Sequence, residues 1–449
     1  FLVYMIADTR YNRKVAFVSA ALFAVLPCTW FLSRIILDSI ALPFLLLSIL
    51  FAIYYAKSKS SNHIDGESYL TPDAKKHRYI LLLGSGIFLG LAIFTKLPIF
   101  TFIPIIIFIL LNKNIINSNS KKAQTGTTRQ YMKTVGIWFI PVLLIPMVWP
   151  AYATLTGHLE DWMDGVIWQA NRADRPFAPE MKTMFWMMDP IILLLGAAGL
   201  VYAFIKRDYF ILLWAFPYLI FIYLVNWVYF FHIIPVIAVF CIGGTLFLFG
   251  LIQKMRNKLL VKVSLFLVFS AIIIFGFINS TLLITQNVND SNFKLAAFVT
   301  GHLPNKEDGP TNSSDKVTLI GPNGAFTIYW IPAYVFDKNF DFKWFEGRRD
   351  YIEPPIKTKD FLMIIDWQMR KLFSGNSTKE HIIYISKLYN SSSMFGVFPN
   401  NSTSYPDIGK YPYTNIRDDV FGEDLHFRGL QWSDKIEVKG NYPNRSLGK

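Results

Sequence analysis

Cysteine is almost absent from this chain, and its absence excludes several classes of protein. The 449 residues include only two cysteines, Cys28 and Cys241, and both lie in apolar runs. The polar C-terminal third has none, so it is not a domain held together by disulfides. The wide spacing of the two cysteines also excludes a zinc or redox motif built from them.

Several other signatures are missing as well. The sequence has no P-loop, no dinucleotide-binding fingerprint, no coiled-coil heptads and no internal repeat. Its seven histidines include no pair at the spacing that places two ligands on one helix face. A complete metal site is therefore not expected from this chain alone.

Charged residues make up only 17% of the chain, whereas 53% of it is hydrophobic and 40 residues are phenylalanine. This composition is typical of a polytopic α-helical membrane protein and not of a soluble domain. The net charge of +13 does not indicate a nucleic-acid partner. The segment from residue 286 onward is nearly neutral, and the excess lies in short loops between apolar runs.

Residues 1–285 form the predicted membrane region, because their apolar runs approach the roughly 20 residues of a membrane-crossing helix. We predict about nine spans: 15–32, 40–56, 79–94, 97–111, 137–155, 191–205, 210–227, 231–250 and a last one that ends near 284. The short apolar segment 1–7 precedes them as the remnant of a further helix. We expect the chain to be truncated upstream of Phe1, with at least one helix and its loop missing.

Charge indicates the orientation of this region. Lysine and arginine concentrate in alternate loops, including the polar loop 57–78, which the positive-inside rule makes cytoplasmic. The opposite loops contain few basic residues, namely Arg34, Lys96, Arg172, Arg175 and Lys182. The long loop 156–188 and the C-terminal domain 286–449 are therefore predicted to be extracytoplasmic, with the whole protein in the cell membrane.

Sequons for N-glycosylation give the same orientation. Asn-x-Ser/Thr occurs at Asn289, Asn312, Asn376, Asn390, Asn400, Asn401 and Asn444, and at Asn279 on the membrane edge. The predicted cytoplasmic loops contain none. The alternative is that an Asn- and Ser-rich domain produces sequons by accident, which leaves the charge argument intact.

The C-terminal domain is predicted to be mixed α/β. Apolar residues at helical spacing predict helices over 292–303 and 381–388. Short β-rich runs predict strands over 316–320, 326–331, 361–365 and 394–398. Beyond Pro399 the Asn, Ser, Tyr and Pro content gives no clear local pattern.

The stretch Ser33–Ser39 is the first candidate functional site. It is a polar break between two apolar runs, so Arg34 and Asp38 are predicted to lie where one span turns into the next. Charge at such a depth is costly and marks residues that line a cavity or bind a ligand. Asp38 is a candidate general base or metal ligand. The alternative is that Arg34 and Asp38 form only a solvated pair at the interface.

Lys96 is the second candidate. It ends a span within Phe94–Pro98, with apolar sequence on both sides, and a fixed cation there is suited to binding a phosphate. The alternative is a lysine whose side chain only extends from a helix end toward the headgroups.

Two external segments complete the candidates. Helical spacing over Leu159–Ala170 predicts an amphipathic helix in the membrane interface, followed by Arg172 and Arg175. This helix either admits a lipid-linked substrate sideways or is an anchor only. His232 follows an aromatic edge and is a candidate substrate or metal contact, or a structural histidine.

Several short motifs resemble those of the GT-C membrane glycosyltransferases related to protein O-mannosyltransferases and bacterial aminoarabinose transferases. They are the basic turn 10–14, the Ala-rich span ending at Leu26–Pro27, Ser33–Arg34 with Leu37–Asp38, the run Gly86–Ala92 before Thr95–Lys96, and His232–Pro235 followed by a span. A helix and a strand within 294–320 also fit. The resemblance covers most of residues 10–320.

The resemblance implies an enzyme that transfers a sugar from a polyprenyl-phosphate (dolichyl-phosphate) donor to a protein, lipid or glycan acceptor on the extracytoplasmic side. It implies substrate-binding or catalytic roles for Arg34, Asp38 and Lys96, and more weakly for His232. Basic residues of such enzymes hold the leaving phosphate, and a carboxylate activates the acceptor. The principal catalytic acid of the family is expected upstream of Phe1, and a divalent metal is left open.

Two other functions are open from the sequence. An oligosaccharyltransferase-like subunit uses the same chemistry, but its Trp-Trp-Asp signature is missing from the C-terminal domain. A transporter or a non-enzymatic scaffold is the other, although inverted repeats and interrupted helices are not evident.

Overall fold

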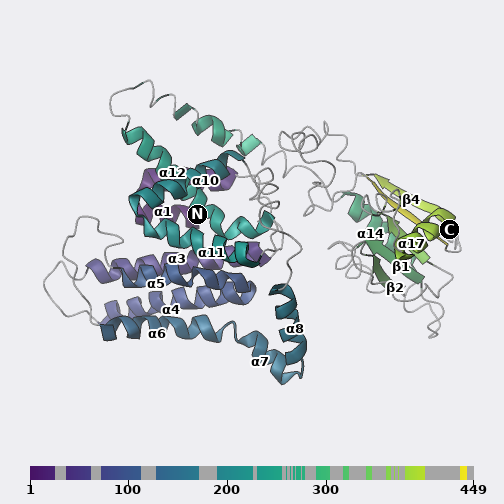
Figure 1. Cartoon of the computed structure of the whole chain (residues 1–449), viewed down its shortest axis with the longest axis horizontal. Helices are drawn as coiled ribbons and strands as arrows, with labels where there is room; N and C mark the ends of the chain where they lie inside the picture. The colour runs from purple at the N-terminus through teal and green to yellow at the C-terminus, as the bar shows by residue number, and fades with distance from the viewer. Residues whose placement is uncertain are drawn as a thin grey trace. The chain divides into compact units, whose positions relative to one another are not determined.

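The chain divides into two compact units, Phe1–Ile284 and Thr285–Lys449 (Figure 1). The computed structural model describes residues 1–25, 37–61, 72–112, 128–170, 190–225, 230–254, single residues and short groups within 259–278, 290–303, 317–322, 340–345, 361–365, 369, 373, 380–399 and 435–441. Each unit has its own core, and we describe them separately.

The first unit is helical. Its helices are α1 (Leu2–Arg10), α2 (Arg13–Val25), α3 (Leu37–Ser61), α4 (Pro72–Thr95), η2 (Leu97–Phe102), α5 (Ile103–Leu111), α6 (Thr128–Leu144), α7 (Val148–Leu155), α8 (Leu159–Ala170), α10 (Pro190–Lys206), α11 (Tyr209–Val225), η4 (Phe230–Ile233) and α12 (Ile234–Lys254), where η marks a 3₁₀ helix. Among the described residues, three helices are long and apolar enough to cross a bilayer: Leu37–Ser58, Pro72–Thr95 and Ile234–Gln253. Shorter apolar helices accompany them, and the total of nine spans stays a prediction.

The predicted span 137–155 is wrong as a single helix. Helix α6 ends at Leu144, α7 begins at Val148, and the two are bent by 41°. Pro146 lies in the break and has no amide hydrogen to continue the helical ladder. The amide of Met147 donates to the Leu143 carbonyl at 3.4 Å, and those of Val148 and Trp149 donate to carbonyls three residues back, at 3.2 and 3.3 Å. The proline therefore divides the segment into two helices. Taken together, these two helices are long and apolar enough to form one bent span.

The predicted polar loop 57–78 is also shorter than expected. Helix α3 continues to Ser61, and α4 already begins at Pro72. Proline suits the first helical position, and Asp73 in the first turn complements the helix dipole. Several basic residues of this segment therefore lie on the ends of α3 and α4. Their long apolar stems suit helix ends that extend beyond the apolar core of the bilayer.

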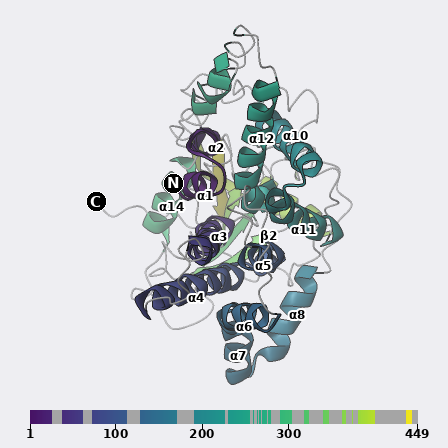
Figure 2. The ribbon, with the colours of Figure 1, turned by 90° about the vertical axis from the view of Figure 1, so that its left-hand side faces the viewer.

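Glycines allow two pairs of helices to pack closely. Helix α4 packs against both α3 and α6 (Figure 2), and α10 packs against α12. A Cβ atom added to Gly90 of α4 would lie 2.6 Å from the carbonyl oxygen of Pro141. One added to Gly199 of α10 would lie 2.2 Å from the carbonyl carbon of Gly243. Membrane helices gain van der Waals contact by such close backbone approach. They need it because burying apolar side chains gives little gain in a lipid that is itself apolar.

Buried hydrogen bonds join three of these helices. The hydroxyl of Ser48 donates to the carbonyl of Ser85 at 2.8 Å, and the hydroxyl of Ser85 donates to the carbonyl of Ser48 at 2.9 Å. The indole N–H of Trp138 donates to the Ser85 hydroxyl at 3.3 Å. These bonds link α3, α4 and α6 in the same way that polar side chains join helices within membranes.

A polar cluster links two helix turns that are distant in the sequence. Tyr11, after α1, donates its hydroxyl to Asp208 at 2.7 Å, and the Arg10 guanidinium lies 3.5 Å from the same carboxylate. Loss of solvation, together with the Asp208 charge, raises the pKa of Tyr11 well above its ordinary value. The phenol therefore stays protonated and keeps donating, which joins the α1–α2 turn to the α10–α11 turn.

The second unit is an α/β layer structure. Its elements are α14 (Asp290–His302), β1 (Val317–Pro322), β2 (Phe340–Phe345), β3 (Phe361–Ile365), α17 (Glu380–Ser391), β4 (Ser393–Pro399) and β5 (Lys435–Asn441). The strands form one sheet in the order β2-β1-β3-β5-β4. Strand β1 is parallel to β2 and β3, whereas β5 is antiparallel to β3 and β4.

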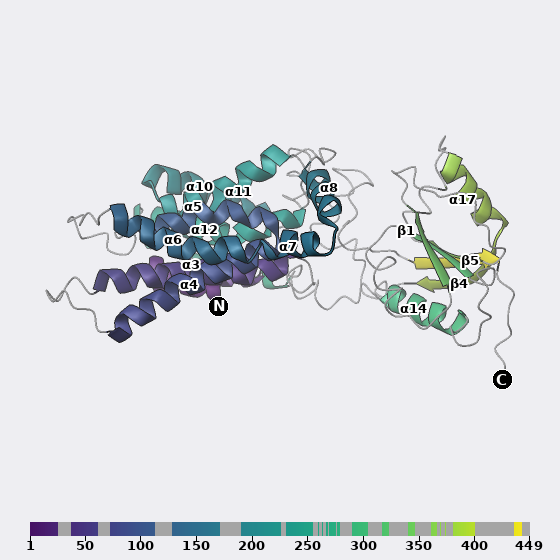
Figure 3. The same ribbon diagram turned by 90° about the horizontal axis from the view of Figure 1, so that it is seen from below.

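Alternation along the strands builds a core on each face of the sheet. Leu319 of β1 pairs with Leu362 of β3, and both belong to the cluster under α14. The next pair, Ile320 and Met363, belongs to the cluster that contains Ile385 of α17. Because successive strand residues point to opposite faces, α14 and α17 cover opposite sides of the sheet (Figure 3).

Most of the predicted elements of this unit are confirmed. The two helices and the strands at 316–320, 361–365 and 394–398 are present, and 326–331 lies outside the described residues. Strands β2 and β5 were not predicted. In β5, Glu437 is buried and the Lys439 ammonium lies 3.9 Å from the ring centre of Tyr389, so a polar sequence still forms an inner strand.

We expect Gly199→Ala to destabilise the helical unit, because its methyl group has no room against the α12 backbone. Overpacking of this kind costs about 1–3 kcal/mol. The matched control is Gly136→Ala, where an added Cβ meets nothing within 4 Å. Thermal unfolding of the detergent-solubilised chain, monitored by size-exclusion chromatography, should show a lower midpoint for Gly199→Ala only. Equal midpoints for the two variants would contradict the close packing of α10 on α12.

Candidate functional site

The two central residues of the candidate site lie at helix ends. Asp38 is in the first turn of α3, where a carboxylate complements the positive end of the helix dipole. Helix α4 ends at Thr95, and Lys96 has an extended backbone with φ −149° and ψ 108°. The 3₁₀ helix η2 then begins at Leu97, and Pro98 lies in its first turn, where its missing N–H is no loss. The chain thus changes direction at the lysine.

Asp38 and Lys96 form a buried ion pair. The Lys96 ammonium donates to Oδ1 of Asp38, and the exposed fractions of the two side chains are 11% and 3%. Removing two charges from water is costly, and the pair recovers this cost only through close contact with each other and with polar neighbours. A pair kept at this cost between apolar helices is a candidate for function.

Tyr218 of α11 contacts the segment that follows Lys96 and the turn that contains His232. Its hydroxyl donates to the backbone carbonyl of His232 at 2.5 Å. Its ring stacks on Phe102, the last residue of η2, with centroids 5.2 Å apart. Tyr218 of α11 therefore links η2, which directly follows Lys96, to η4.

His232 is buried, and its role as a substrate or metal contact stays a prediction. Only 9% of it is exposed, and it lies where η4 leads into α12. Trp214 and Tyr218 of α11 donate to the Pro235 and His232 carbonyls and cover this turn. The structure thus links the His232 backbone, by way of Tyr218, to the η2 segment that follows Lys96.

Other predicted site residues lie outside the described part of the chain. These are the substrate-binding candidates Arg34, Arg172 and Arg175, and the sequon residues Asn289, Asn312, Asn376, Asn400, Asn401 and Asn444. Asn390 is described, and it is exposed on α17. The roles given to these residues stay predictions.

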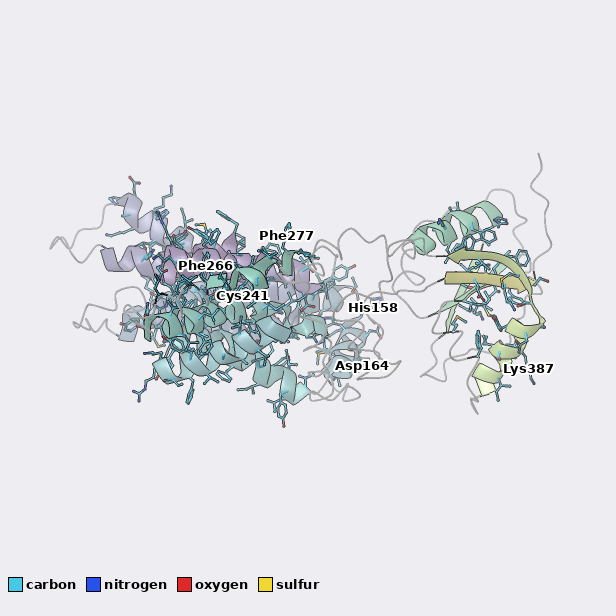
Figure 4. All side chains as sticks on the ribbon, turned by 90° about the horizontal axis from the view of Figure 1, so that it is seen from above. His158, Asp164, Cys241, Phe266, Phe277 and Lys387 are labelled. Atoms are coloured by element: carbon cyan, nitrogen blue, oxygen red, sulfur yellow. The ribbon has the colours of Figure 1, made fainter. Side chains whose placement is uncertain are left out.

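The predicted interfacial helix is confirmed as a helix. Helix α8 spans Leu159–Ala170, and its apolar residues Leu159, Met163 and Ile167, spaced four apart, are 39%, 44% and 49% exposed. The acidic residues of α8, including Asp164, are also exposed, and His158 precedes the helix (Figure 4). An apolar stripe beside an acidic one suits a helix lying in the headgroup region. Its part in substrate entry stays a prediction.

The donor set of the site is a carboxylate, an ammonium and a phenol. Within the residues that the structure describes, no group of three or more His, Cys, Asp or Glu side chains is placed to hold a metal ion. The possible divalent metal stays a prediction. The arrangement can bind an anion through Lys96 and accept a proton at Asp38.

Sequence reasoning missed Tyr218. The residue lies in a long apolar run that also contains Tyr223, and nothing in the local pattern separates the two. A general signal was available, because a buried tyrosine hydroxyl usually finds a hydrogen-bond partner. The identity of that partner depends on how α11 packs on η4.

Comparison with known proteins supports the resemblance over part of the chain. Residues 1–159 match the family model of dolichyl-phosphate-mannose-protein mannosyltransferase. The match includes Asp38 and Lys96 and ends before Tyr218, His232 and the second unit. Comparison with curated proteins and with solved structures gave no significant match. Together with the apolar helices, the family match makes this chain a helical membrane protein.

We expect removal of either member of the ion pair to destabilise the helical unit, and removal of both to restore much of the loss. Asp38→Asn or Lys96→Met leaves one buried charge without its partner, which costs about 3–5 kcal/mol. The double variant buries no unpaired charge. The measurement is a double-mutant cycle on thermal unfolding midpoints of the solubilised chain. Additive losses in the double variant would contradict direct coupling between the two side chains.

Proposed function

We propose that this chain, whose residues 1–159 belong to the dolichyl-phosphate-mannose-protein mannosyltransferase family, is a membrane glycosyltransferase that takes a sugar, mannose in the first instance, from a polyprenyl-phosphate donor. The acceptor is a protein, lipid or glycan hydroxyl on the extracytoplasmic side. Asp38 and Lys96 are the residues to which we assign the chemistry.

The buried ion pair of Asp38 and Lys96 supports this proposal. A lysine that served only to reach the headgroups would extend into solvent, but 11% of the Lys96 side chain is exposed and its ammonium contacts a carboxylate. A preorganised cation among apolar helices interacts with a phosphate more strongly than it would in water. The pair also lies within the family match.

The reaction breaks the bond between the anomeric carbon of the sugar and a phosphate oxygen, and forms a bond from that carbon to the acceptor oxygen. The electron pair of the broken bond leaves with the polyprenyl phosphate. Lys96 stabilises the negative charge that develops there. The proton of the acceptor hydroxyl passes to a carboxylate, for which Asp38 is the described candidate.

The ion pair also gives a reason for the order of events. In the absence of substrate, Asp38 neutralises Lys96 and compensates for its loss of hydration. A lipid phosphate that approaches Lys96 offers the ammonium a second anionic partner, which weakens its hold on Asp38. The carboxylate then becomes available as a base when the donor is bound.

We assign supporting roles to the remaining candidates. Arg34, Arg172 and Arg175 are proposed to contact the phosphate or the sugar, and His232 to contribute through its position beside Tyr218. The orientation of the positive loops and the sequons support an extracytoplasmic active site and C-terminal domain.

One observation favours a transporter as the second candidate. The α6–α7 pair is bent by 41°, which the sequence did not reveal, and the break that the sequence indicated at Lys96 and Pro98 is present. Transporters use such breaks to bind ions and substrates. Solute flux through vesicles that contain the chain, without any sugar transfer, would favour this function.

We expect Lys96→Met to reduce sugar transfer by about 10²–10³-fold, the usual cost of losing one group that stabilises transition-state charge. The assay is transfer of labelled mannose from dolichyl-phosphate mannose by the full-length protein in proteoliposomes. The control is Lys133→Met, which removes an exposed lysine from α6.

The double variant Asp38→Asn/Lys96→Met separates activity from stability. It is expected to regain much of the stability that either single variant loses, since no charge is left unpaired, and yet to be inactive. Full turnover in this variant would overturn the site assignment, and no turnover in the wild type would overturn the proposed function.

We expect Asn390 to carry an N-linked glycan when the chain is made in a host that N-glycosylates. A variant that keeps only this sequon should lose electrophoretic mobility, and treatment with an N-glycosidase should restore it. Asn390→Gln in that background is the matched control. If the N-glycosidase also leaves the mobility of the wild-type chain, which has all its sequons, unchanged, the second unit lies on the cytoplasmic side.

A further inference from the structure

Tyr218 is a buried polar side chain to which the proposed reaction assigns no role. It lies on α11 with 1% of its surface exposed, outside the residues matched by the family model. A phenol among apolar helices is stabilised only if its hydroxyl is hydrogen-bonded. The hydrogen bond it makes is to a backbone atom of the candidate site.

The hydroxyl of Tyr218 supports a turn that contains a proline. His232 lies in the 3₁₀ helix η4, where a carbonyl accepts from the amide three residues on. Three residues after His232 is Pro235, which has no amide hydrogen. The Tyr218 hydroxyl donates to this carbonyl at 2.5 Å and so fixes the turn from outside.

The ring of Tyr218 holds the segment that follows Lys96. It stacks on Phe102 with centroids 5.2 Å apart and 23° between the planes. One turn later on α11, Phe221 makes an edge-to-face contact with Phe100, at 5.4 Å. Helix α11 thus fixes η2, whose first residue directly follows Lys96.

We propose that Tyr218 is a positioning residue that sets the distance between the Asp38–Lys96 pair and the η4 turn. It contacts both the segment that follows Lys96 and the turn that contains His232. This inference rests on the proposed function, because the pair that it positions is the one assigned to the lipid phosphate. Its effect is on the geometry of that pair during transfer.

The test is Tyr218→Phe, which removes the hydroxyl and keeps the ring on Phe102. We expect kcat for transfer from dolichyl-phosphate mannose to fall about tenfold or more, since small displacements of catalytic groups are costly. The KM for the donor should change little, because Lys96 keeps its charge. A structural role alone would reduce the yield of folded protein and leave kcat per folded molecule unchanged.

Trp214→Phe is the matched control. Trp214 precedes Tyr218 by one turn of α11, is fully buried, and donates its indole N–H to the Pro235 carbonyl at 3.4 Å. Its loss weakens the contact between α11 and α12 without removing the ring that stacks on η2. We expect kcat to be retained in this variant.

Five outcomes are distinguishable. A fall in kcat for Tyr218→Phe alone supports the positioning role, whereas wild-type kcat in that variant, or an equal fall in Trp214→Phe, overturns it. If Tyr218→Phe is not recovered folded, Phe102→Leu takes its place, and an unchanged kcat there overturns the role. A wild-type protein that transfers no sugar contradicts the proposed function itself, before either variant is compared.

Discussion

The arrangement of the helical unit depends on a buried ion pair between Asp38 and Lys96. The two residues are 58 positions apart, one at the start of α3 and the other just after α4. Neither charge is stable alone among apolar helices, so each requires the other at close range. The pair thereby fixes the relation of the two helix ends, and it leaves a cation and a carboxylate together among apolar helices.

The packing around this pair explains how membrane helices hold it in place. Glycines let α4 approach α6 and α10 approach α12 at backbone distance, and reciprocal serine bonds join α3 to α4. Apolar side chains are as stable against lipid as against protein. These close contacts and hydrogen bonds therefore hold the helices together more than the hydrophobic effect does. Rigid helices, in turn, keep charged groups within the small tolerances that transition-state stabilisation requires.

The second unit follows different rules. Its sheet has helices on both faces, and the parallel strands β1, β2 and β3 lie beside an antiparallel pair. Alternate residues supply a core to each face, which is why β3 is apolar throughout and was evident in the sequence. Strand β5 was not evident, because it has Lys435, Glu437 and Lys439, and its place within the sheet depends on its neighbours.

The sequence by itself determined the membrane character, the helical periodicity, the β-rich runs and the candidates Asp38 and Lys96. All of these follow from hydropathy, from residue spacing and from the high cost of charge between apolar runs. Only the tertiary structure decided that Asp38 pairs with Lys96, that Pro146 breaks a span, and that Tyr218 reaches the His232 carbonyl. Each of these depends on groups far apart in the chain or on the direction of a bend, and local sequence patterns do not encode either.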